Sequence, residues 1–341
     1  MIETILEQYP FLAYVFLVLG FLFLIKGGDW FVDSASGIAK RFHLPELLIG
    51  ATVVSIGTTL PEVMTSAIGA IDGNGAMAYG NAIGSIICNT SLIAALTIAI
   101  KPAKVDRKPL VFPVCFFFVV AAFYALNAYI FEEFRLWMGI VLLVGFVVYM
   151  VINVLNMKNN PESVEIDEHS LDVNEASEES DNGSLLKDII ILVVSAAVIA
   201  VGAKLLVSGA TKIANDFNVA PTIISLTIVA LGTSLPELVT AVTALMKGHG
   251  ALSLGNIIGA NIFNLVLVSG AAITINPFEV PADATFLGQN ASFVFDIPLV
   301  FLVMGIMTIP TLITGKLRRW QGITLLTLYA AYCVLQFVIL A

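Results

Sequence analysis

The stretch "GTTLPE", Gly57 to Glu62, places a proline and an acidic residue inside a long apolar run. A close variant, "GTSLPE", recurs 175 positions later at Gly232 to Glu237. The same offset, without a gap, pairs further glycine and asparagine residues: Gly80 with Gly255, Asn81 with Asn256, Gly84 with Gly259, and Asn89 with Asn264. The motif and its repeat therefore predict a chain of two related halves.

The composition is that of a polytopic membrane protein. Of 341 residues, 58% are hydrophobic and 12% are charged, and the mean hydropathy is +0.96. An apolar helix of about 20 residues crosses the roughly 30 Å of bilayer hydrocarbon. We predict ten such helices, at 9–38, 45–71, 76–100, 110–130, 136–157, 188–213, 219–246, 250–275, 291–314 and 320–341.

Each half contains five predicted spans, and an odd number makes the second half enter the membrane from the opposite side. The halves are residues 1–157 and 188–341, joined by a polar linker at 158–187. Inverted repeats interrupted by glycine and proline at matching places are typical of secondary transporters with a site at the repeat interface. We therefore predict an all-α integral membrane protein, built from two inverted five-helix repeats with broken helices at a central ion site.

Orientation is predicted from the lysine and arginine residues of the short loops, which cytoplasmic loops retain. With the N-terminus outside, twelve of these residues fall inside and two, Arg135 and Lys212, fall outside. The formal net charge of −9 comes from the linker, because Pro161 to Gly183 contains nine acidic residues and no lysine or arginine. This composition predicts a disordered cytoplasmic connector.

The repeated glutamates are predicted to lie near the middle of the membrane. Glu62 precedes the turn near Gly75 by 13 residues and Asn89 follows it by 14, which at about 1.5 Å per residue places both roughly 20 Å from that turn. Glu237 and Asn264 flank the "KGHG" turn similarly. A buried carboxylate costs about 2.5–3.5 kcal/mol on insertion scales, so a pair needs a partner. Oxygen-rich surroundings and two negative charges favour a hard divalent cation such as Ca²⁺.

Proline and hydroxyl residues of the motif would add neutral oxygen ligands. Pro61 and Pro236 lack an N–H, which frees the carbonyls of Gly57 and Gly232 and loosens those of Thr58 and Thr233. The hydroxyls that then surround the carboxylates belong to Thr58, Thr59, Thr233 and Ser234. Glycines in the "GNxxG" segments would let the helices approach closely.

Three charged residues lie in the first span. Lys26, Asp29 and Asp33 are three and four positions apart, a spacing that predicts an ion pair on one helix face. Alternatively, Asp29 and Asp33 line the cytoplasmic mouth of the ion pathway. Their counterparts in the second half are Lys204 and Ser208.

These motifs resemble those of the cation/calcium exchanger superfamily, specifically its prokaryotic sodium/calcium exchanger-like members. The resemblance covers essentially the whole chain, and two "GT(S/T)LPE … GNxxG(S/A) … N" blocks carry it. It implies a multi-pass protein of the cytoplasmic (inner) membrane that exchanges Ca²⁺ for Na⁺ by alternating access, with the first and sixth helices sliding across a rigid core. We expect a transporter and not an enzyme, with no cofactor and no nucleic-acid partner; the oligomeric state is left open.

The resemblance also implies the ligands. Calcium would bind Glu62 and Glu237 together with the backbone carbonyls of Thr58 and Thr233. Sodium would use the same glutamates with Ser55, Thr58, Thr59, Ser85, Asn89, Ala230, Thr233, Ser234 and Asn264, where Ser55 and Ala230 act through their backbones. Two positions depart from the family pattern: Ala260 replaces a frequent serine, and Asn264 stands where some relatives have aspartate.

Three alternatives remain open at this point. A proton-coupled divalent-cation antiporter could use the same fold. An intramembrane hydrolase could use the paired carboxylates around a water, although no protease motif is present and inverted halves do not suit an asymmetric reaction. A passive channel is the third, and it would not require a counter-ion on the opposite side.

Overall fold

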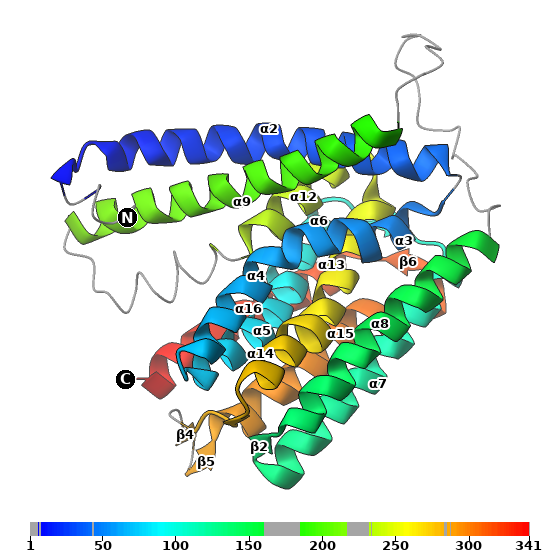
Figure 1. Cartoon of the computed structure of the whole chain (residues 1–341). Coiled ribbons are helices and arrows are strands. Elements are labelled where there is room, and N and C mark those ends of the chain that lie inside the picture. Colours follow the sequence, from blue (N-terminus) through cyan, green and yellow to red (C-terminus); the bar gives the residue numbers. More distant parts are fainter. Residues whose placement is uncertain are drawn as a thin grey trace.

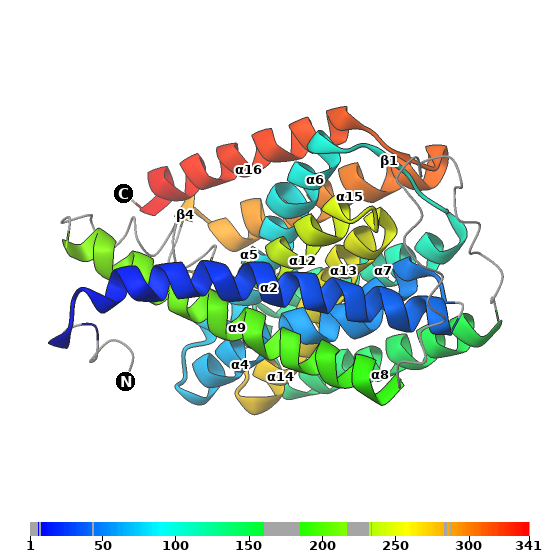
Figure 2. The same cartoon turned by 90° about the horizontal axis from the view of Figure 1, so that it is seen from above.

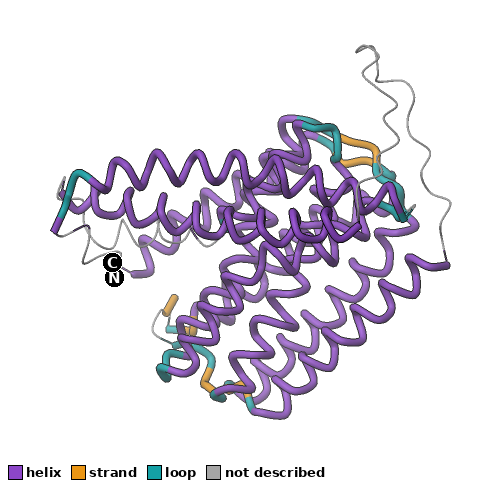
Figure 3. Tube along the Cα trace, turned by 45° about the horizontal axis from the view of Figure 1, so that its top comes forward, coloured by secondary structure: helices purple, strands orange, loops and turns teal. Residues whose placement is uncertain are grey.

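The computed structural model describes residues 6, 8–42, 44–159, 185–216, 232, 234–282, 285–286 and 288–340. Nearly all of them lie in helices, as Figure 3 shows. Most of the predicted linker, residues 160–184, and part of the seventh predicted span, residues 219–231, fall outside the described residues.

The first half contains five membrane-length runs of helix separated by short turns and strands. Their elements are α2 (Leu12–Arg41), α3 (Glu46–Ile49), η1 (Gly50–Val54), α4 (Ser55–Ile71), α5 (Gly75–Cys88), η2 (Asn89–Ala94), α6 (Ala95–Ile100), β1 (Ala103–Lys104), α7 (Lys108–Phe131), β2 (Glu133–Phe134) and α8 (Leu136–Asn159). The segments named η are π-helical turns within longer helices.

The described part of the second half follows a similar order, with an additional strand pair and a π-helical segment before its fourth span. Its elements are α9 (Leu185–Asp216), α12 (Leu235–Met246), α13 (Gly250–Phe263), η5 (Asn264–Val268), α14 (Ser269–Ile275), β3 (Phe278–Glu279), β4 (Thr285–Phe286), β5 (Gln289–Asn290), η6 (Ser292–Asp296), α15 (Ile297–Thr314), β6 (Lys316–Leu317) and α16 (Arg319–Leu340). The described helices coincide with the predicted spans to within a few residues at most of their ends.

Eight helical runs of the described residues are long and apolar enough to cross a membrane. The shorter apolar α12 is the described remainder of the seventh predicted span, and the 22-residue α16 occupies the tenth. The predicted all-α membrane fold is thus confirmed.

Four spans form the centre of the bundle. In the apolar stretch of Gly250–Ile275, 83% of residues are buried, and in those of Gly75–Ile100 and Glu46–Ile71 the shares are 72% and 61%. The corresponding share for α8 and α9 is 28%, because their outer faces carry exposed valine, leucine and isoleucine side chains suited to lipid. The fourth of these spans includes α12, which packs on α13. The repeated motifs of both halves therefore lie in this centre.

The helices α2 and α9 pack side by side and cross one flank of the bundle (Figures 1 and 2). Glycines make their close approach possible. A β-carbon added to Gly20 would lie 2.7 Å from the backbone nitrogen of Leu206, and one added to Gly209 would lie 2.5 Å from the carbonyl oxygen of Ala13. The first and sixth spans therefore form one paired unit.

Two short antiparallel strand pairs show the repeat symmetry independently of the motifs. In one, β1 pairs with β6, with Ala103 opposite Leu317; in the other, β2 pairs with β3, with Phe134 opposite Phe278. Strands β1 and β3 are 175 positions apart, and β2 and β6 both follow the fourth span of their half. Each pair thus joins a loop of one half to a loop of the other, as two interlocked inverted repeats require.

Candidate ion-binding site

Two fully buried carboxylates lie at the centre of the fold. Glu62 is on α4 and Glu237 is in the first turn of α12, and both are 0% exposed. The two carboxylates interact electrostatically. Within the described residues, no group of three or more histidine, cysteine, aspartate or glutamate side chains comes together. The site therefore has two acidic groups surrounded by neutral ones.

The hydroxyls of the first motif reach across to the second half. Thr59 Oγ1 donates to Glu237 Oε1 at 3.5 Å. Thr58 Oγ1 donates to Asn256 Oδ1 at 3.2 Å, and Ser55 Oγ donates to the backbone oxygen of Asn256 at 2.9 Å. Residues 178 to 201 positions apart thus share one buried cluster, which links the halves directly.

Five of the predicted ligands have buried polar atoms without a hydrogen-bond partner among the described residues. These atoms are both carboxylate oxygens of Glu62, Oε2 of Glu237, the amide atoms of Asn89 and Asn264, and the hydroxyl of Ser234. A buried polar group left unpaired costs about 1–3 kcal/mol, and more if it is charged. Such a concentration of unpaired oxygens fits a bound hard cation, which accepts carboxylate, amide and hydroxyl oxygens as ligands.

Both asparagines begin a π-helical segment. The segment η2 begins at Asn89 and η5 begins at Asn264, so the break recurs at the matched position of each half. The wider turn changes the partners of the backbone carbonyls, and in η5 the hydroxyl of Ser269 donates to the carbonyl of Asn264 at 2.9 Å. Both helices therefore depart from α-helical geometry at the matched asparagines.

The two prolines do not act alike. Pro61 lies inside α4, which continues to Ile71, whereas Pro236 lies in the first turn of α12. Proline is compatible with a first turn, where its missing N–H has no helical partner to lose. In the helix that carries Pro61, the departure from α-helical geometry precedes the proline and lies in η1 at Gly50–Val54.

A second layer of asparagines, which the sequence reasoning did not assign, braces the motif helices. Asn81 Nδ2 donates to the carbonyl of Glu62 at 3.0 Å and to Ser66 Oγ at 2.8 Å. On the other side, Asn256 Nδ2 donates to Thr240 Oγ1 at 2.9 Å. The signal was available, because Asn81 and Asn256 are matched by the offset of 175.

The glycines of the second "GNxxG" segment let helices touch through their backbones. A β-carbon at Gly255 would lie 2.1 Å from the carbonyl oxygen of Leu47, and one at Gly259 would lie 2.6 Å from Cα of Ala51. The expected close approach is thus confirmed for this half. At Gly80 and Gly84 an added β-carbon would meet no atom of the described residues within 4 Å, so the close approach expected there is not seen in the described part of the chain.

Of the remaining predicted ligands, one is buried and two are not among the described residues. Ser85 on α5 is buried, as is Ala260, which occupies the matched position on α13. Thr233 and Ala230 lie outside the described residues.

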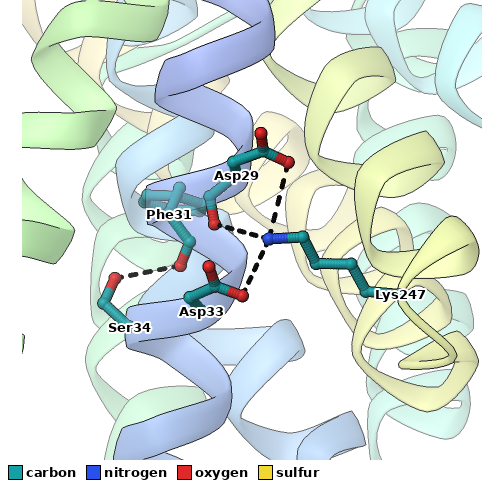
Figure 4. A network of polar contacts seen from close by, with 5 residues as sticks. All are labelled: Asp29, Phe31, Asp33, Ser34 and Lys247. Atoms are coloured by element: carbon teal, nitrogen blue, oxygen red, sulfur yellow. Dashed lines mark hydrogen bonds and ion pairs between the residues drawn. The ribbon is translucent and has the colours of Figure 1, made fainter. Parts of the chain in front are cut away.

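The acidic residues of α2 pair with a lysine that is not part of this cluster. Asp29 and Asp33 both pair with Lys247 (Figure 4), and Lys26 forms no ion pair within the described part of the chain. The predicted Lys26–Asp29 pair is therefore wrong, because a lysine 218 positions away takes the carboxylate.

The family of the chain follows from its similarity to known proteins. The family model described as "Sodium/calcium exchanger protein" matches residues 12–155 and 187–338. The chain belongs to the sodium/calcium exchanger family. The exchanger is 33% identical to the sodium/calcium exchanger MaX1 of Methanosarcina acetivorans, over 96% of this chain and 99% of that one. It is also 32% identical to the inner membrane protein YrbG of Escherichia coli, over 86% and 88% of the two chains.

Solved structures agree with this assignment. The sodium-calcium exchanger NCX_Mj, soaked with Na⁺ and Sr²⁺, is 31% identical to this exchanger, with a TM-score of 0.77 over 95% of this chain and 98% of that one. The match confirms the ten-span fold of inverted repeats. The exchanger is accordingly a multi-pass cation/calcium antiporter, a secondary transporter and not an enzyme.

Proposed function

We propose that this chain exports Ca²⁺ in exchange for Na⁺ by alternating access, at one site shared by Glu62 and Glu237. The observation that carries the proposal is the fully buried pair of carboxylates, three of whose four oxygens have no hydrogen-bond partner among the described residues. Two negative charges in a neutral surrounding match one divalent cation. An oxygen-only ligand set is the one that Ca²⁺ prefers.

Sodium would compete for the same carboxylates. The neutral oxygens proposed for it are those of Ser55, Thr58, Thr59, Ser85, Asn89, Ala230, Thr233, Ser234 and Asn264, and the carbonyls of Thr58 and Thr233 are those proposed for Ca²⁺. Because Asn264 is uncharged, the site keeps two negative charges in either state. One Ca²⁺ leaves the site neutral, whereas three Na⁺ would leave one positive charge, so exchange at that ratio would be electrogenic.

The organisation proposed around this site follows the charge pattern of the loops. Both termini lie outside a cytoplasmic membrane, and the linker at 158–187 lies in the cytoplasm between the halves 1–157 and 188–341. Asp29 and Asp33 face the cytoplasmic end in this orientation.

The proposal is tested by Ca²⁺ uptake into proteoliposomes loaded with Na⁺, with internal and external pH clamped. We expect uptake to require the outward Na⁺ gradient and to stop when K⁺ replaces the internal Na⁺. A negative external potential, set with valinomycin, should change the rate if exchange is electrogenic. Uptake that ignores Na⁺ and follows a pH gradient would show a proton-coupled antiporter instead, and uptake without any counter-ion would show a channel.

A further inference from the structure

Lys247 ties α2 to the turn between α12 and α13 (Figure 4). Its Nζ lies 2.8 Å from Asp33 Oδ1 and 3.4 Å from Asp29 Oδ1, and it also donates to the backbone oxygen of Asp29 at 3.1 Å. In the proposed orientation this turn is at the cytoplasmic end. One side chain therefore fastens the α2–α9 unit to the central hairpin there.

The helices beneath this ion pair are in close contact. A β-carbon added to Gly28, beside Asp29, would lie 2.6 Å from Cγ1 of Val239 and 3.0 Å from Oγ1 of Thr243. Both of these residues are on α12, one and two turns before Lys247. The interface between α2 and α12 is thus closed.

The repeat gives this interface a counterpart with the charges exchanged. The offset of 175 matches Asp29 with Lys204 on α9, and Lys247 with Asp72 at the turn after α4. It also matches the contacting residues Gly28, Val239 and Thr243 with Ala203, Met64 and Ile68. The helix residue is the acidic Asp29 in the first half and the basic Lys204 in the second. The turn residue is the basic Lys247 at one interface and the acidic Asp72 at the other.

In the structure this counterpart is open. Ala203, Lys204, Met64 and Ile68 all line a cavity of about 800 Å³ between α9 and α4. Lys204 and Asp72 are both exposed, and neither forms an ion pair within the described part of the chain. The two halves therefore hold their matched interfaces in different states, one packed and fastened and the other apart.

We propose that Asp29–Lys247 and Lys204–Asp72 are alternative latches, each closed in one of the two access states. The inference rests on the proposed alternating access, because inverted repeats exchange their conformations when access passes from one side to the other. In the other access state, the interface between α9 and α4 closes in the way that the interface between α2 and α12 is closed in this structure. Lys204 then pairs with Asp72. The structure corresponds to the state with the α2 latch closed.

The exposure of these side chains suits a latch that must open in every cycle. The side chains of Lys247, Asp29 and Asp33 are 27%, 38% and 64% exposed. Partly exposed ion pairs are weak, so each latch biases the equilibrium between states by a few-fold and does not lock it. Residues that touch no ion would in this way set the balance of the two states.

The test uses the double variant Lys204→Cys with Asp72→Cys, treated with a short bifunctional thiol reagent in proteoliposomes. We expect cross-linking to stop Ca²⁺ uptake, because it holds the second latch shut. Chemical cleavage of the reagent that joins the two cysteines should restore uptake. Adding Lys247→Gln should speed cross-linking by a few-fold, since it opens the first latch at the opposite end of the bundle. Lys26→Gln is the control, because Lys26 is on α2 one turn before Asp29 and exposed but forms no ion pair among the described residues. The native chain, with Cys88, Cys115 and Cys333, controls for the reagent.

Failure to cross-link, uptake that continues in the cross-linked protein, or equal cross-linking rates with Lys247→Gln and Lys26→Gln would each overturn the latches. A second measurement needs no thiols: Asp72→Lys should slow uptake a few-fold, and Lys204→Asp in the same chain should restore it. The cross-linking rate does not depend on which ions are carried. If it responds to Lys247→Gln while the native chain shows no Na⁺-driven uptake, the latch stands and the proposed function fails.

Discussion

Glu62→Gln and Glu237→Gln are each expected to lower Na⁺-driven Ca²⁺ uptake by at least about 100-fold, and by similar factors. Two unit charges 4 Å apart interact by about 4 kcal/mol at an effective dielectric constant of 20, and a divalent ion doubles this interaction. Even half of the interaction energy of two unit charges, about 2 kcal/mol, corresponds to more than a tenfold loss in Ca²⁺ affinity. The glutamates are also proposed to bind Na⁺, so their loss affects both ions. The similar size of the two losses follows from their matched positions in the inverted halves.

The control for these variants is Glu133→Gln. Glu133, in strand β2, pairs with Arg135, and the side chain of Glu133 is 43% exposed. The same chemical change there should leave uptake within about twofold of the native rate. If either central variant retained more than a tenth of the native rate, the two carboxylates would not form one obligatory site.

Asn256→Leu is expected to weaken Ca²⁺ binding by about 30-fold or more. The amide donates to Thr240 Oγ1 and accepts from Thr58 Oγ1, and its backbone oxygen accepts from Ser55. Hydrogen bonds between membrane helices contribute about 0.6 kcal/mol on average and up to about 1.7. Losing two of them near the upper value removes about 3 kcal/mol, which exceeds the roughly 2 kcal/mol that this factor represents. The hydroxyl of Thr240 keeps its bonds to the carbonyls of Pro236 and Glu237, and that of Thr58 keeps its bond to the carbonyl of Ser55.

The measurement is the Ca²⁺ affinity of purified protein by isothermal titration calorimetry. Asn127→Leu is the matched control, because the amide of Asn127 donates within its own helix to the carbonyl of Phe123. An affinity of Asn256→Leu equal to that of the control would show that Asn256 does not position the site.

The repeat made much of this site predictable. Glu62 and Glu237 stood out because a charged residue in an apolar span costs free energy, and because the second glutamate lies at the repeat offset of 175 positions from the first. The fold class followed from span count and parity alone. Both inferences use regularities that a linear sequence displays directly.

What could not be predicted depends on which residues meet in three dimensions. An asparagine in a span is compatible with packing, bracing or ligation, so Asn81 and Asn256 needed their partners to be seen. The spacing of Lys26 and Asp29 indicated a helical ion pair, whereas Lys247 reaches both aspartates from another half of the chain. The π-helical turns at Asn89 and Asn264 likewise leave no trace in residue type.

The central claim, that two inverted halves supply one shared site, is tested most directly by the number of Ca²⁺ ions bound per chain. Equilibrium binding of radioactive Ca²⁺ to purified protein, free of Na⁺, should give one ion per chain, and Glu62→Gln or Glu237→Gln alone should abolish that binding. Two ions per native chain, with one retained by each single variant, would contradict a shared site and show two independent ones.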